Sequence, residues 1–133
     1  MSQSRSKPSL PPLRVLLASS EVHPYSKTGG LADMTGALGR ALARLGHEVG
    51  IVKPLFRGLR ERFPQMHRLQ WRFDLPLGER RVDGELWAHE PEPRLTVYFI
   101  GHEGYFNRAG LYNENGRDYP DNAERFIFFS KCV

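Results

Sequence analysis

The change of apolar pattern between residues 14 and 54 constrains the fold more than any other feature of this chain. Residues 14–19 form a short, nearly continuous apolar run, which is typical of a central parallel strand buried on both faces. Apolar residues then recur at spacings of three and four, which predicts one buried stripe of a helix (Leu31, Met34, Leu38, Leu42 and Leu45). Gly46 follows as a helix C-cap, and residues 47–54 form a second strand. This order predicts a right-handed βαβ unit and therefore an α/β fold.

The loop Lys27-Thr28-Gly29-Gly30 connects the first strand of this unit to its helix. Such loops lie at the carboxyl edge of the sheet, where α/β proteins bind ligands. The two glycines let a ligand approach the backbone, the helix end offers unpaired N–H groups, and Lys27 adds a positive charge. These features together favour a diphosphate. Asp33, in the first helical turn, either stabilises the positive helix end or contacts a sugar hydroxyl.

Two familiar phosphate-binding motifs do not fit this loop. In a P-loop the lysine and the hydroxyl residue follow the glycines, whereas Lys27 and Thr28 precede them. A dinucleotide fingerprint needs G-x-G-x-x-G, and the next glycine after Gly29 and Gly30 is Gly36. A P-loop NTPase and an NAD- or FAD-binding protein are therefore disfavoured. A Gly-Gly turn that binds nothing stays open as an alternative.

The second half of the chain is predicted to extend the sheet and to end in a helix. Residues 56–64 read as a short helix, and residues 69–88 alternate apolar and polar side chains around a turn, as in a β-hairpin. Residues 95–100 are β-branched and aromatic and are expected to join the parallel sheet. Asp121 or Asn122 is the expected N-cap of a final helix.

The connection between residues 101 and 120 is long for a compact domain and rich in aromatic and amide side chains. Sugars present apolar faces and hydroxyl edges, so these residue types suit a carbohydrate site. The same residue types also favour turns, so both readings stay open. The candidate glucan contacts here are Tyr105, Phe106 and Tyr112.

Composition narrows the protein class. The 133 residues suit one globular domain, and no apolar run approaches the length needed to cross a bilayer. Residues 1–12 are expected to be a disordered leader. Their composition also suits a transit peptide, but the stretch is short for one, so a bacterial tail and a cytoplasmic location are preferred, with a plastid as the alternative. The one cysteine, Cys132, allows no intramolecular disulfide, and no metal-ligand spacing is present.

The arginines between residues 57 and 81 alternate with acids and match no nucleic-acid motif, which indicates a solvated face.

Three segments resemble the family of bacterial glycogen synthases and plant starch synthases. Residues 20–33, SEVHPYSKTGGLAD, are similar to the opening signature of that family. Residues 106–112, FNRAGLY, and residues 118–126, DYPDNAERF, are similar to two later segments, in the same order. The resemblance covers residues 13–133, with the region 56–94 only loosely patterned.

The resemblance implies a partial N-terminal domain of a GT-B glycosyltransferase: a Rossmann-like parallel sheet with helices on both faces, plus a β-hairpin. It implies retaining, metal-independent transfer of glucose from ADP-glucose to the non-reducing end of an α-1,4-glucan, with no cofactor. By the resemblance, Lys27 matches the lysine at the donor diphosphate, and Gly29 and Gly30 offer backbone contacts to the donor. Asp33 is a secondary candidate near the glucose. The active-site residues of the C-terminal domain have no counterpart here, so no catalytic residue is assigned.

Three questions stay open at this point. The chain is either part of such an enzyme or a non-catalytic remnant that holds sugar nucleotide or glucan without turnover. A different GT-B transferase is a further alternative, for which this loop sequence is atypical. The sequence does not decide between ADP-glucose and UDP-glucose, or between glycogen and starch.

Overall fold

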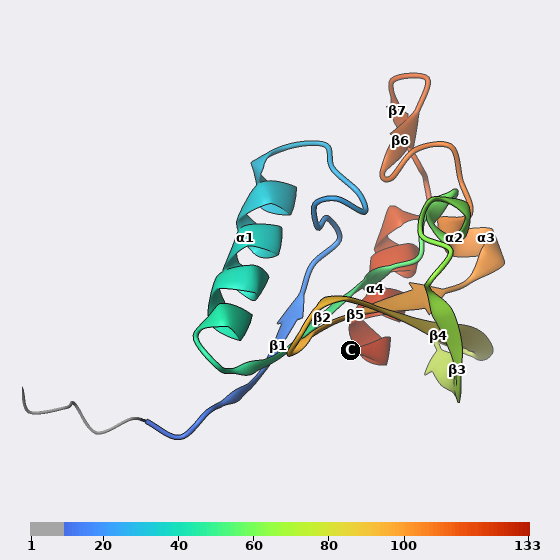
Figure 1. Cartoon of the computed structure of the whole chain (residues 1–133). Helices are drawn as coiled ribbons and strands as arrows, with labels where there is room; N and C mark the ends of the chain where they lie inside the picture. The colour runs from blue at the N-terminus through green and yellow to red at the C-terminus, as the bar shows by residue number, and fades with distance from the viewer. Residues whose placement is uncertain (1–9) are drawn as a thin grey trace, which may run out of the picture.

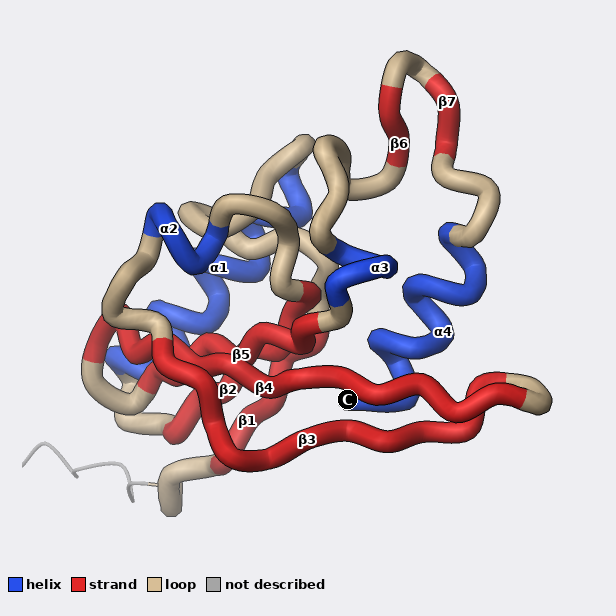
Figure 2. The backbone as a smooth tube through the Cα atoms, turned by 90° about the vertical axis from the view of Figure 1, so that its right-hand side faces the viewer, coloured by secondary structure: helices blue, strands red, loops and turns tan. Residues whose placement is uncertain are grey.

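The computed structural model describes residues 10–133, and the expected leader lies mostly outside them. Five strands form one sheet in the order β1-β2-β5-β4-β3, and two very short strands form a separate hairpin, β6-β7 (Figures 1 and 2). The elements in chain order are β1 Arg14–Ala18, α1 Gly30–Arg44, β2 Glu48–Pro54, α2 Leu59–Arg62, β3 His67–Leu77, β4 Arg80–Glu92, β5 Leu95–Gly101, α3 Glu103–Phe106, β6 Asn113–Glu114, β7 Arg117–Asp118 and α4 Asn122–Cys132. None of these helices is long and apolar enough to cross a membrane.

The sheet combines a parallel half and an antiparallel half. Strands β1, β2 and β5 run parallel, which confirms the βαβ unit and the predicted place of the strand at 95–100. Strands β3 and β4 form the predicted hairpin and add to β5 in antiparallel orientation. The parallel carboxyl ends of β1, β2 and β5 therefore share one edge, where the loop 19–29 begins.

Helices cover both faces of this sheet. Gly39 of α1 packs on Ile51 of β2, and Gly84 of β4 packs on Phe128 of α4. The strand registers place Ile51 and Gly84 on opposite faces, because Ile51 pairs with Val97, Val97 pairs with His89, and His89 and Gly84 are five residues apart along β4. The predicted α/β architecture with helices on both faces is confirmed.

Strand β1 differs from its prediction as a central strand buried on both faces. It is an edge strand, with β2 as its neighbour, and its residues alternate between exposed and half-buried. Leu16 is 55% exposed and lies opposite Gly50 of β2, which supplies no side chain to cover it. An apolar run thus predicts a buried strand only where neighbouring side chains cover both of its faces.

The helix α1 presents a different face to the sheet from the one predicted. Leu38 is 41% exposed and Met34 is 55% exposed, whereas the buried positions carry small side chains (Ala32, Thr35, Gly36, Gly39 and Ala43). The reason is a close approach of the helix backbone to β2: a Cβ atom at Gly39 would lie 2.6 Å from Cδ1 of Ile51. Of the predicted stripe, Leu42 alone packs against the core, and Leu31 and Leu45 are exposed.

A fully buried lysine lies at the end of β2. The Nζ atom of Lys53 donates a hydrogen bond of 2.6 Å to the carbonyl of Pro54 and lies 4.7 Å from the ring centre of Phe56. Burial lowers the pKa of Lys53 well below its ordinary value, with Arg62 adding to this effect and Glu21 opposing it. A group with a lowered amine pKa costs folding free energy at neutral pH, because the unfolded chain binds the proton more tightly.

We expect Lys53→Met to raise the free energy of unfolding by about 1–3 kcal/mol near pH 7. The gain should shrink as the pH rises towards about 10.4, where the unfolded lysine also loses its proton. Urea denaturation at a series of pH values measures both effects. Lys131→Met is the matched control, because Lys131 donates a similar 2.7 Å hydrogen bond to the carbonyl of Pro76 but is exposed. Equal effects of the two substitutions would contradict this account.

Candidate functional site

The predicted ligand loop leaves the carboxyl end of β1 and enters α1, as the βαβ pattern requires (Figure 1). Its charged pair consists of Lys27 and Asp33. Nζ of Lys27 lies 2.7 Å from Oδ2 of Asp33, and both side chains are about half exposed, at 49% and 53%. The hydrogen bond from Lys27 holds the pKa of the Asp33 carboxyl below its usual range. The loop therefore presents a lysine to solvent beside the first turn of a helix.

The two glycines of the loop lie on open surface. A Cβ atom built at Gly29 or at Gly30 meets no other atom within 4 Å. Gly29 has an extended backbone with φ −167°, which any residue adopts, so its conformation does not demand glycine. The bare surface above both residues instead leaves room for a ligand to reach the backbone, which favours the ligand-binding interpretation over a simple turn.

The N-terminus of α1 has no side-chain cap. The first N–H groups of any α-helix have no intrahelical partner, and here the N-cap residue Gly29 provides no side-chain acceptor for those of the 15-residue α1. The partial positive charge of the helix end and the ammonium group of Lys27 lie on the same surface. An anion of the size of a diphosphate finds N–H donors and a full positive charge together here.

Sequence analysis missed the residue that holds this loop in place, Glu21. Its side chain is buried at 5% exposure and accepts hydrogen bonds from the backbone N–H of Thr28, the hydroxyl of Thr28 at 2.8 Å and the N–H of Gly29 at 3.3 Å. Burial by itself raises the pKa of Glu21, but hydrogen bonds from Tyr112, Thr28 and Gly29 outweigh it and leave the pKa below its ordinary value. The signal in the sequence is weak: an acid that stands three residues after the end of β1, beside the apolar Val22.

This arrangement refines the role expected for the two glycines. The N–H group of Gly29 already donates to Glu21, so it is turned towards the protein. The donors left for a ligand are those that follow it in the first turn of α1, beginning at Gly30.

The three candidate glucan contacts lie in different surroundings. Phe106 has no exposed surface and Tyr105 is 6% exposed; both belong to the aromatic core with Phe128. We correct the expectation for these two residues, because side chains packed in this way offer no face to a sugar. Tyr112 is partly exposed, and its hydroxyl donates a hydrogen bond of 2.7 Å to Oε2 of Glu21. Tyr112 is thus the one candidate of the three that meets the ligand loop.

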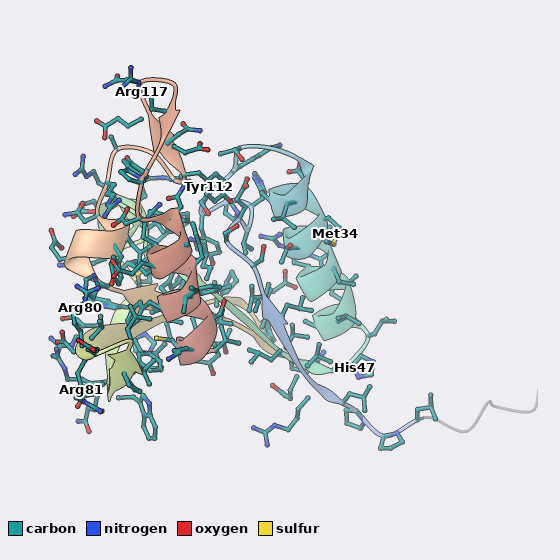
Figure 3. All side chains as sticks on the ribbon, turned by 180° about the vertical axis from the view of Figure 1, so that it is seen from behind. Met34, His47, Arg80, Arg81, Tyr112 and Arg117 are labelled. Atoms are coloured by element: carbon teal, nitrogen blue, oxygen red, sulfur yellow. The ribbon has the colours of Figure 1, made fainter. Side chains whose placement is uncertain are left out.

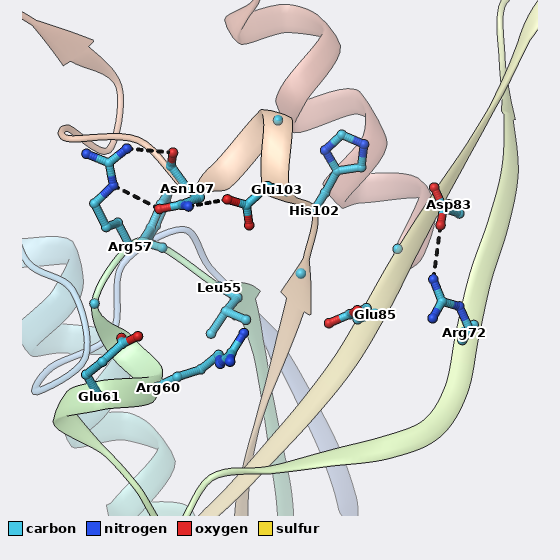
Figure 4. Close-up of a pocket in the computed structure, with 15 residues that line it drawn as sticks. Leu55, Arg57, Arg60, Glu61, Arg72, Asp83, Glu85, His102, Glu103 and Asn107 are labelled. Atoms are coloured by element: carbon cyan, nitrogen blue, oxygen red, sulfur yellow. Dashed lines mark hydrogen bonds and ion pairs between the residues drawn. The ribbon is translucent and has the colours of Figure 1, made fainter.

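A separate cavity of about 370 Å³ opens where β2 and β5 end, bounded by α2, α3 and the start of β4 (Figure 4). None of the predicted site residues lines it. Its charged side chains nearly balance in sign, and several are already paired, as Arg72 is with Asp83 at 3.0 Å and Arg57 with Asn107 at 2.8 Å. This lining does not resemble a phosphate site. In residues 10–133 no group of three side chains is arranged to hold a metal ion.

The fold and the loop define a class: an α/β protein whose parallel strands end at one edge of the sheet, where folds of this class have their ligand sites. Residues 14–133 match the family model of the starch synthase catalytic domain. The chain belongs to this family.

Individual relatives agree with this assignment. The chain is 44% identical over 119 residues to a glycogen synthase of Syntrophotalea carbinolica, covering 90% of this chain and 24% of that one. It is 42% identical over 124 residues to glycogen synthase 1 of Geobacter sulfurreducens, covering 91% and 25%. The catalytic domain of starch synthase IV from Arabidopsis thaliana, bound to ADP and acarbose, superposes with a TM-score of 0.73 at 28% identity, covering 92% and 24%. The chain thus spans about a quarter of the length of the relatives it matches.

The hydrogen bonds of Glu21 give a test of the site's architecture. We expect Glu21→Gln to lower the free energy of unfolding by about 1–3 kcal/mol near pH 7, because a buried charge-assisted network is lost. Since the folded pKa of Glu21 is below the unfolded value of about 4.3, its contribution is complete above that pH. The contribution is lost as the pH falls through the folded pKa, so the two proteins should converge in acid.

Urea denaturation near neutral pH and in acid measures this difference. Glu114→Gln is the matched control, because Glu114 also accepts a hydrogen bond from a tyrosine, Tyr119, but is exposed. A pH-independent difference between the wild type and Glu21→Gln would count against a stabilising carboxylate.

Proposed function

We propose that this chain is the N-terminal, donor-binding part of a glycogen or starch synthase. The reaction is transfer of glucose from ADP-glucose to the non-reducing end of an α-1,4-glucan, with retention at the anomeric carbon. The observation that carries the proposal is the uncapped N-terminus of α1 beside Lys27, at the carboxyl edge of the sheet of a starch synthase family member. The ADP and acarbose bound to the Arabidopsis starch synthase IV domain support a nucleotide donor and a glucan acceptor.

Each residue of the loop has a chemical role in this proposal. Lys27 places its ammonium group on the donor diphosphate, where negative charge grows as the bond to glucose breaks. The N–H groups from Gly30 onward add hydrogen bonds to the same oxygens. Asp33 faces the glucose hydroxyls, and because an ammonium has three donors, Lys27 can bind phosphate while keeping one bond to Asp33. The proposal includes no metal and no cofactor, because the lysine and the helix end supply the positive charge.

The proposal assigns the rest of the active site to a C-terminal domain. No catalytic residue is assigned to residues 1–133, and we expect these residues alone to show no detectable transferase activity with ADP-glucose and glycogen. We also propose a bacterial cytoplasm as the location of this chain, because the chain is similar to bacterial glycogen synthases, among them those of Syntrophotalea and Geobacter.

A second candidate function is a binding module that holds sugar nucleotide or glucan without turnover. The exposed Lys27 and the uncapped end of α1 favour it, because they suit the binding of an anion and include no group assigned to the reaction. Joining the chain to the C-terminal domain of a glycogen synthase relative decides between the two. Restored glucosyl transfer supports the enzyme, and binding without transfer supports the module.

Lys27 gives the direct test of donor binding. We expect Lys27→Gln to weaken binding of ADP to the isolated chain about ten- to hundredfold, because a charge-assisted hydrogen bond to phosphate contributes about 1.5–3 kcal/mol. Asp33→Asn should leave ADP binding unchanged or strengthen it, since a negative charge beside the diphosphate is removed. NMR titration that follows the amide signals of Gly30 and Leu31 measures both affinities.

Lys131→Gln is the control, because it removes an exposed lysine that lies on α4. If ADP fails to shift the signals of the first turn of α1 in the wild type, the donor-site proposal fails. A parallel titration with UDP should give a similar affinity, because the ADP contacts proposed for this chain all go to the diphosphate and none to the base.

A further inference from the structure

We propose that Tyr112 is a positioning residue for the donor loop, acting through Glu21. The inference rests on the donor site proposed above and adds a residue that lies 91 positions further along the chain than Glu21. It gives Tyr112 a different role from the glucan contact expected from the sequence.

The neighbours of the Tyr112 hydroxyl determine which hydrogen bond it donates and which it accepts. It donates its single proton to Oε2 of Glu21 at 2.7 Å. Because that proton is used, the 2.6 Å contact with Oγ of Ser20 must be a hydrogen bond donated by Ser20. The tyrosine hydroxyl is therefore held on both sides, by Ser20 at the start of the loop after β1 and by the carboxylate of Glu21.

The carboxylate divides its bonds between its two oxygens. Oε2 accepts from Tyr112 and from the hydroxyl of Thr28, whereas Oε1 accepts from the backbone N–H groups of Thr28 and Gly29. Tyr112 thereby fixes the rotation of the carboxylate that orients these two amides. The next residue, Gly30, begins α1, so the chain of bonds ends at the first N–H donors of the proposed anion site.

The other side of Tyr112 is anchored to α4 and to the base of the β6-β7 hairpin. Its carbonyl accepts hydrogen bonds from Nδ2 of Asn122 at 2.9 Å and from the N–H of Tyr119 at 3.0 Å. Its ring lies 5.8 Å from that of Phe126 of α4. Figure 3 shows Tyr112 between the hairpin and the loop that precedes α1. The residue thus transmits the position of a packed helix to an exposed loop.

The protonation states suit this role at neutral pH. Burial and then the hydrogen bond to Glu21 raise the pKa of Tyr112 to about 12, so the hydroxyl keeps the proton that it donates. The pKa of Glu21 stays below its ordinary value, so the acceptor stays charged. A charged acceptor strengthens the bond that holds the loop.

Tyr112→Phe tests the proposal, because it removes one oxygen and keeps the ring against Phe126. We expect hydrogen exchange of the Thr28 and Gly29 amides to become at least about tenfold faster, since their acceptor is no longer fixed. The affinity for ADP, from the NMR titration above, should fall about three- to tenfold. The pH midpoint of the Thr28 amide signal should move upward, because Glu21 loses a donor that favours its charged form.

Tyr119→Phe is the matched control. The hydroxyl of Tyr119 bonds to Glu114 and to the N–H of Gly110, both within the same connection, and has no bond to Glu21. It should leave exchange at Thr28 and Gly29 and the ADP affinity within about twofold of the wild type. A purely structural role for Tyr112 predicts equal effects of both substitutions on these readouts, and that result overturns the proposal.

Two further outcomes keep the test decisive. If Tyr112→Phe does not fold, Ser20→Ala removes the donor to the tyrosine oxygen and should cause a smaller change in the same direction; unchanged exchange and affinity then overturn the proposal. If the wild type binds ADP and Tyr112→Phe binds it equally well, this inference alone fails. If the wild type does not bind ADP, the donor site itself fails, and the positioning role fails with it.

Discussion

A buried carboxylate, that of Glu21, sets the geometry on which the ligand loop depends. Its side chain is 5% exposed and accepts four hydrogen bonds from Thr28, Gly29 and Tyr112. A carboxylate buried without hydrogen-bond donors would become protonated or would disrupt the loop. The charged form of Glu21 and the conformation of the loop therefore depend on each other. The result is a backbone that stays ordered up to Gly29 and then exposes the bare end of α1 to solvent.

The close packing of α1 on β2 is the second constraint, and it shows where reasoning from the sequence stops. The spacing of Met34 and Leu38 located the helix correctly but not its buried face. The buried face depends on how near the helix backbone lies to Ile51, and that distance is set by Gly39 across the contact. The periodicity of apolar residues predicts that large apolar side chains face the sheet, whereas a helix packed closely on a sheet buries small side chains.

In the candidate site, too, local features could be predicted from the sequence and contacts between distant residues could not. The order of strand, loop and helix placed Lys27, Gly30 and Asp33 correctly at one helix end, because local patterns determine local neighbours. The composition of the connection 101–120 made Phe106 a candidate glucan contact, although the residue is fully buried. Sequence analysis also missed the link from Tyr112 to Glu21, because a contact between residues 91 positions apart leaves no spacing to recognise.

The ion pair between Lys27 and Asp33 explains how this site can be both preformed and available. Both side chains are about half exposed, and exposed pairs of this kind contribute only about 0–1 kcal/mol, so an arriving anion loses little by rearranging them. The backbone below is held by Glu21, so the same anion need not order the loop. In the proposed donor site, the exposed ammonium group of Lys27 is free to move above fixed N–H groups, so it can follow a diphosphate as its charge changes. The buried hydrogen bonds of Glu21 thus hold the backbone of the loop in place, whereas the exposed pair of Lys27 and Asp33 can rearrange above it.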